Sequence, residues 1–82
     1  MLKYKNKKGE VMEAEKVGKN VENLITERKI KKEEVAQKIG ININTFERKI
    51  EGKEEFLAYE IVKLINLFNL STSECAKIFF CE

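Results

Sequence analysis

The stretch KEEVAQKIGININTFERKIEG, from Lys32 to Gly52, constrains the fold of this chain more than any other segment. Apolar residues recur at helical spacing on both sides of Gly40, which predicts two short helices over 32–39 and 42–51. Glycine ends a helix at a left-handed backbone position without steric cost, so Gly40 is expected to form the turn between them. Their inward faces are expected to carry Val35, Ala36, Ile39, Phe46 and Ile50.

Ala36 supports the same geometry, because two helices that cross at a steep angle need a small residue where they touch. Gly52 follows the second helix and is expected to end it. Two short helices with apolar inner faces, joined by a glycine turn, form the pattern of a helix-turn-helix.

The chain has room for one small domain, predicted over residues 16–82. Residues 1–15 carry several lysines without a strong period, which predicts a flexible basic arm, with Met12 as a candidate start of the folded part. Hydrophobic residues at 43% and charged residues at 37% are typical of a globular protein. The sequence has no apolar run of about 18 residues, as a membrane span requires, and no export signal, so a cytoplasmic location is expected.

Helical spacing of apolar residues from Val17 onward predicts a helix over 16–29. Gly18 is expected to weaken its first turn, and Asn20 is an alternative N-cap. Ile30 then connects this helix to the core.

Two more helices are predicted after Gly52, over 58–68 and from 72 to about 80. Phe56 and Leu57 are expected to return the chain to the core before the first of them. Ser71 and Glu74 have the spacing of a capping box for the second. The apolar end of that last helix, Ile78–Phe80, either packs on the 16–29 helix or forms a dimer contact. The predicted fold class is therefore all-α, with five helices and no strand.

The absence of histidine argues against enzymatic chemistry, because the usual general base for a serine or cysteine nucleophile is missing. No metal site is expected either, since Cys75 and Cys81 are the only cysteines and do not form a CxxC pair. They are expected to be free thiols. No cofactor and no small-molecule ligand are predicted.

Charge is distributed unevenly along the chain. Residues 1–20 and 21–53 carry net charges of +3 and +2, whereas residues 54–82 carry −3. A basic front half suits a protein that turns one face toward a polyanion. Lys31 and Lys32 stand at the start of a predicted helix, where the helix dipole disfavours cations, and this placement hints at an external anion.

From about Gly18 to Phe80 the chain resembles the lambda-repressor-like, Cro/CI-type helix-turn-helix family of DNA-binding proteins. The resemblance rests on GKNVENLITERKIKKEEVAQKIGININTFERKIEGK, which follows the family's order of first helix, connector, second helix, turn and recognition helix. The closing EFLAYEIVKLINLFNLSTSECAKIFF is similar to the tails of small phage-encoded regulators. The resemblance implies a five-helix fold and a repressor-like regulator that binds duplex DNA as a pair of subunits.

The family's recognition helix enters the major groove, which implies base contacts by the outward residues of the 42–51 helix. Arg48 would contact guanine or phosphate, Asn44 adenine, and Ile43 a thymine methyl group, with Asn42 beside them. Glu47 would accept from a cytosine amine or orient Arg48. The positions implied for phosphate contacts are Lys31, Lys32 and Lys53, with Lys19 and Asn20 as weaker candidates.

Several residues depart from the family pattern. Lys32 replaces a common glutamine, Ile25 replaces a frequent arginine, and Ile43 replaces a polar side chain. Glu47 and Glu51 bring negative charge toward the groove. The alternative function is therefore a protein-interaction adaptor that keeps the fold and binds protein through Ile43 and the aromatic C-terminal end.

Overall fold

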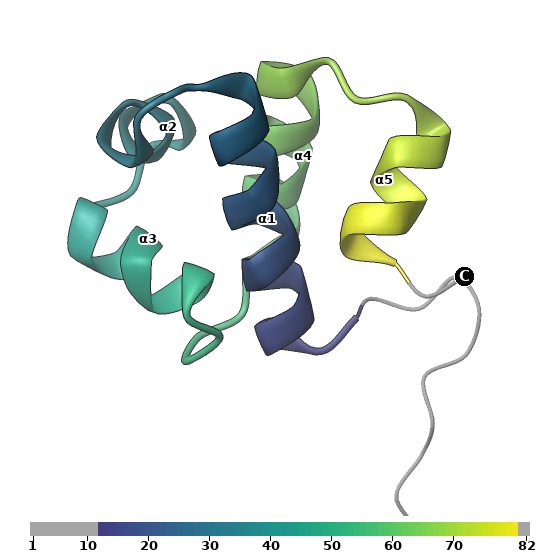
Figure 1. The fold of residues 1–82 in the computed structure, drawn as a ribbon. Helices are drawn as coiled ribbons and strands as arrows, with labels where there is room; N and C mark the ends of the chain where they lie inside the picture. Colours follow the sequence, from purple (N-terminus) through teal and green to yellow (C-terminus); the bar gives the residue numbers. More distant parts are fainter. Residues whose placement is uncertain (1–11, 81–82) are drawn as a thin grey trace, which may run out of the picture.

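The computed structural model describes residues 12–80, and within this range it contains five helices and no strand. The helices are α1 (Ala14–Arg28), α2 (Lys32–Ile39), α3 (Ile43–Ile50), α4 (Ala58–Phe68) and α5 (Thr72–Phe79). In Figure 1, α1 and α4 occupy the centre, α2 and α3 lie on one side, and α5 lies on the other. The all-helical prediction is confirmed for this range. None of its helices combines the length and the apolar character needed to cross a membrane.

Most helix boundaries agree with the sequence prediction, and α1 is the exception. This helix begins at Ala14, so Ala14 and Glu15 belong to it and not to the predicted arm. The first 11 residues of that arm lie outside the described range. Asn20 is not an N-cap, because it lies within α1, and its side-chain amide donates to the Ile78 carbonyl oxygen at 3.0 Å. This hydrogen bond ties α1 to the C-terminal end of α5.

The turn between α2 and α3 is built as the glycine pattern predicts. Gly40 has φ of 80°, in the left-handed region that favours glycine. The Ile41 N–H then donates to the Ala36 carbonyl oxygen at 3.0 Å, as in a Schellman turn. Asn42 caps α3 by accepting the Asn44 N–H at 2.7 Å. In Figure 1, α2 is seen nearly end-on while α3 runs across the view, so the two helices are steeply inclined to each other.

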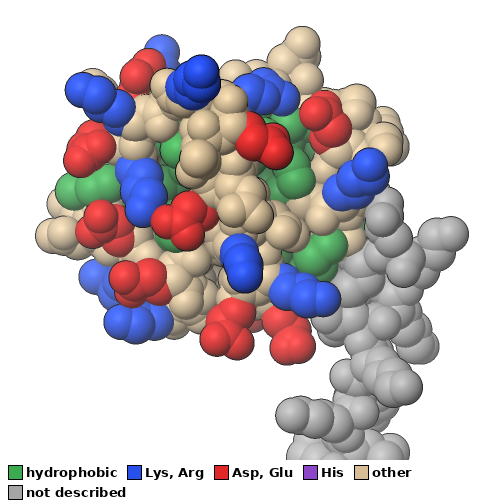
Figure 2. Space-filling view, in the orientation of Figure 1, with side chains coloured by type: hydrophobic (Ala, Val, Ile, Leu, Met, Phe, Trp, Pro, Cys, Tyr) green, Lys and Arg blue, Asp and Glu red, His purple; other side chains and the backbone are tan. Residues whose placement is uncertain are grey.

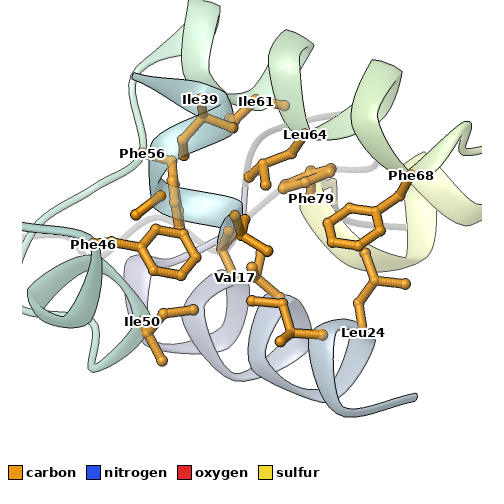
Figure 3. Close-up of a cluster of buried hydrophobic side chains, with 14 of the residues drawn as sticks. Val17, Leu24, Ile39, Phe46, Ile50, Phe56, Ile61, Leu64, Phe68 and Phe79 are labelled. Carbon is orange, nitrogen blue, oxygen red and sulfur yellow. The ribbon is translucent and has the colours of Figure 1, made fainter. Parts of the chain in front are cut away.

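The core collects apolar side chains from all five helices and from the segments that join them (Figure 3). The five residues predicted to face inward from α2 and α3 are all buried, at 6% exposure or less. Phe46 and Phe56 meet edge to face with ring centroids 6.0 Å apart. Phe79 is fully buried and α5 packs against α1, which confirms the packing alternative for this end of the chain.

Leu57 does not return to the core and is 51% exposed. Its backbone is extended, with φ of −76° and ψ of 155°, so its side chain points away from the side taken by buried Phe56. The prediction was wrong for Leu57 and correct for Phe56. Cys75 is a half-buried free thiol, and Cys81 lies outside the described residues.

Gly18 allows α3 to approach α1 closely. A Cβ atom placed on Gly18 would lie 2.2 Å from the Ile50 carbonyl oxygen, which is much shorter than any van der Waals contact. The sequence predicted that Gly18 weakens the first turn of this helix. Because α1 begins at Ala14, Gly18 lies beyond that turn, and this prediction was wrong. It marks the point where the backbones of α1 and α3 touch, and it thereby fixes where α3 lies on the domain.

Candidate nucleic-acid interface

Helix α3 has one buried edge and one exposed polar edge. Phe46, Lys49 and Ile50 are buried, whereas Asn44, Glu47 and Arg48 are exposed. The three exposed positions have the spacing i, i+3, i+4, so their side chains form one row along the helix. Such a row can contact a ligand that lies along α3.

The N-terminal end of α3 presents fewer free groups than predicted. Asn42 is exposed, but its side-chain oxygen already accepts the Asn44 N–H as the helix cap. Ile43 is half-buried and packs against the core, so only part of its side chain is available for an apolar contact. The Asn44 side chain remains exposed.

Arg48 is held by groups other than the one predicted. Its Nε donates to the Glu54 carboxylate, and its Nη2 donates to the Thr45 hydroxyl at 3.4 Å. In the free chain, therefore, Glu54 from the turn after α3 orients Arg48, and that Glu47 accepts from a cytosine amine stays a prediction. The Arg48 side chain is still 48% exposed, so its guanidinium group remains accessible.

Lys32 lies at the start of α2 and is paired with Glu22 of α1, with Nζ and Oε2 3.0 Å apart. The hydrogen bond to Glu22 raises the pKa of Lys32 above its ordinary value, and the charge of Glu47 acts in the same direction. Together with Ile50 and Glu51, these three side chains line a hollow of about 170 Å³ between α1, α2 and α3. Lys32, which was predicted to contact phosphate, is thus surrounded by carboxylates.

The two remaining predicted cations differ from each other. Lys53 is 69% exposed and pairs with Glu51 at 3.2 Å. Lys31, the N-cap residue of α2, is exposed and has no carboxylate within 4 Å among the described residues. On the face shown in Figure 2, basic and acidic side chains are interspersed and form no patch of one sign.

Four cations and four carboxylates lie around α3, so their formal charges sum to zero. The cations are Lys31, Lys32, Arg48 and Lys53, and the carboxylates, which lie beside the last three of these, are Glu22, Glu47, Glu51 and Glu54. Sequence reasoning missed Glu22 and Glu54 as partners. Glu22 is ten residues before Lys32 and Glu54 is six residues after Arg48, and neither spacing indicates an ion pair.

A buried ion pair supports α3 from below. Lys49 and Glu60 are 4% and 1% exposed, with Nζ and Oε1 2.5 Å apart. Glu60 also accepts the Leu57 N–H at 2.8 Å, which satisfies a backbone donor at the start of α4. The Lys49 ammonium lies 5.9 Å from the centre of the Phe56 ring. This pair was missed from the sequence, and it links α3 to α4 beneath the exposed row.

Within residues 12–80, no group of three or more histidine, cysteine, aspartate or glutamate side chains is placed to hold a metal ion. Comparison of the chain with protein-family models, with curated proteins and with solved structures found no match. The functional assignment therefore rests on the geometry of α2, α3 and the charges around them.

Proposed function

We propose that this protein is a DNA-binding transcriptional regulator with a lambda-repressor-like helix-turn-helix fold. In this proposal α3 enters the major groove of duplex DNA, and the N-terminal end of α2 lies against the phosphate backbone. Repression would follow from occupying a promoter. A phage or mobile-element origin belongs to the same proposal.

The observation that carries the proposal is the exposed row of α3 on a rigidly supported helix. Asn44 offers an amide of the type that pairs with adenine, and Arg48 offers a guanidinium of the type that pairs with guanine. The contact at Gly18 and the Lys49–Glu60 pair hold the opposite side of α3. A side chain on a fixed helix loses less conformational freedom on binding than one on a mobile loop.

Selection of bound sequences from a random duplex pool tests the proposal most directly. The affinity for a selected duplex should then fall as the salt concentration rises, because neutralised phosphates release counterions. Arg48→Ala should weaken this binding by roughly 1–3 kcal/mol and relax specificity at one base position. Lys77→Ala, which removes an exposed cation from α5, is the matched control and should leave affinity unchanged.

Two outcomes would overturn the proposal. One is the absence of any enriched sequence together with no duplex binding at micromolar protein. The other is an operator affinity that Arg48→Ala and Lys77→Ala change equally, since that would leave only a general effect of charge.

Binding as a pair of subunits on a two-fold operator is part of the proposal. One helix reads few base pairs, so proteins of this type gain affinity by placing two helices in successive major grooves. Sedimentation of the complex with a selected duplex should give two chains per duplex. A stoichiometry of one would refute the pairing.

A protein-interaction adaptor is the second candidate, and the balanced charge around α3 favours it. Non-specific DNA binding depends on excess positive charge, which the four carboxylates beside α3 remove. The adaptor surface expected from the sequence is small, however, because Phe79 is fully buried and only parts of the half-buried Ile43 and Phe80 are accessible. An adaptor would therefore need further exposed apolar surface.

A further inference from the structure

The outer side of α4 carries an exposed apolar surface that the proposed DNA contacts do not use. Three large apolar residues in the described range are about half exposed, namely Leu57, Tyr59 and Val62, at 51%, 55% and 53%. Leu57 is the N-cap residue of α4, and Tyr59 and Val62 lie in its first half. Their clustering on one helix distinguishes them from the isolated exposed apolar residues that most protein surfaces carry.

Helical spacing extends this surface along α4. Tyr59, Val62, Lys63, Asn66 and Leu67 stand at i, i+3, i+4, i+7 and i+8, and we call them the α4 outer stripe. The buried side of the helix carries Glu60, Ile61, Leu64 and Phe68. The stripe thus lies on the side of α4 opposite these buried residues, with half-buried Leu67 at its edge, where it also packs against the core.

Two lysines lie at this surface, Lys63 within the stripe and Lys38 of α2 beside it. A hollow of about 330 Å³ is lined by Lys38 of α2 and by Lys63, Asn66 and Leu67 of α4. The Lys63 ammonium lies 5.5 Å from the centre of the Tyr59 ring, so it stands over the apolar part of the stripe. Neither lysine has a carboxylate within 4 Å among the described residues, and no carboxylate lines the hollow.

We propose that the α4 outer stripe, with Lys38, binds an acidic amphipathic segment of a partner protein, whose apolar side chains cover Tyr59, Val62 and Leu67 while its carboxylates pair with Lys38 and Lys63. An amphipathic helix presents both groups at the required spacing, and a shallow apolar surface edged by charge is a usual site for such a helix. No residue of this surface belongs to α3.

The chemistry of the surface favours an acidic protein segment over a second copy of the chain and over nucleic acid. A second copy of the chain in a two-fold contact would bring the same patch against itself, gathering four lysines without a lining carboxylate. Nucleic acid could place phosphates at Lys38 and Lys63, but it would leave the aliphatic side chains uncovered and find one aromatic ring, Tyr59, on which a base could stack. An acidic protein segment satisfies the lysines and covers the apolar residues together.

Selection of displayed random peptides against the full chain tests this proposal. The enriched peptides should be acidic, with apolar residues at helical spacing. A labelled synthetic consensus peptide should shift the backbone amide NMR signals of residues 58–67. Lys38→Glu/Lys63→Glu should weaken its binding at least about tenfold, because two attractions become repulsions. Lys16→Glu/Lys77→Glu is the control, since it reverses two exposed lysines outside the surface.

Val62→Asp supplies a second variant that tests the apolar contact, and circular dichroism confirms that each variant is folded. Recovery of no peptide, recovery of basic peptides, or equal loss in both double variants would overturn the proposal. So would displacement of the peptide by a random duplex, or dimerisation of the free chain that Val62→Asp abolishes. The peptide should bind equally well in the presence of a selected operator, so this result is independent of the DNA-binding proposal.

Discussion

Removing Lys49 should destabilise the domain severely, because its partner would remain buried. Glu60 is 1% exposed, and Lys49 supplies its counter-charge at 2.5 Å. Breaking such a pair by deleting one partner typically costs about 3–5 kcal/mol, since an uncompensated charge stays out of water. Chains of this length have a total stability of about 4–12 kcal/mol. Lys49→Met should therefore remove a large part of the free energy of unfolding.

The double variant Lys49→Met/Glu60→Gln should recover much of this loss. Glutamine keeps an oxygen that can accept the Leu57 N–H, which Glu60 accepts at 2.8 Å, but it carries no charge. Its amide N–H groups would be buried without an acceptor, at a cost of about 1–3 kcal/mol. We expect the double variant to be at least about 2 kcal/mol more stable than Lys49→Met alone.

Urea denaturation followed by far-ultraviolet circular dichroism measures these differences for a small two-state domain. Lys53→Met is the control, because its pair with Glu51 is exposed at the surface and should be worth less than about 1 kcal/mol. A loss below about 1 kcal/mol for Lys49→Met would refute the reasoning. So would a double variant whose loss equals the sum of the two single losses.

Three further predictions follow from single contacts. Gly18→Ala should cost about 3 kcal/mol in urea denaturation, because the added methyl group meets backbone, whereas alanine's better helix propensity alone would stabilise α1. Glu22→Gln should free Lys32 and steepen the salt dependence of duplex binding by about one counterion, with Glu27→Gln as an unchanged control. The Ser71 N–H, donating at 2.9 Å, lowers the pKa of Glu74. The ionised Glu74 carboxylate therefore stabilises the fold at pH values above the ordinary carboxyl pKa, and this contribution is lost as the pH falls through the lowered pKa of the folded state. The stability of Glu74→Gln should therefore decline less in acid than that of the unmodified chain.

Local pattern was sufficient to predict the elements and their inner faces. The apolar residues of α2 and α3 are spaced for one helical side, and any fold that buries this side must bury Val35, Ile39, Phe46 and Ile50. Caps are equally local, and Ser71 and Glu74 form the predicted capping box, with the Glu74 N–H donating to the Ser71 hydroxyl at 3.1 Å. The information in both cases lies within a few residues.

Contacts between distant residues could not be predicted in this way. The role of Gly18 depends on where α3 crosses α1, and the burial of Lys49 depends on a carboxylate eleven residues away on another helix. Position 49 does lie three residues after Phe46, on the buried edge of α3, so helical geometry alone signalled its burial. Because lysine side chains are usually exposed to water, Lys49 was nevertheless not expected to be buried.

The carboxylates beside α3 affect non-specific and specific DNA binding differently. A phosphate that contacts Lys32 or Arg48 must replace Glu22 or Glu54, so one anion is exchanged for another and fewer counterions are released. Non-specific affinity, which arises almost entirely from counterion release, is therefore expected to be low. Asn44 is uncharged and has no carboxylate partner to give up. The free energy of its hydrogen bonds to a base edge is therefore independent of the carboxylates that pair with Lys32 and Arg48. In the proposed complex, paired cations thus raise the ratio of specific to non-specific binding while lowering both affinities.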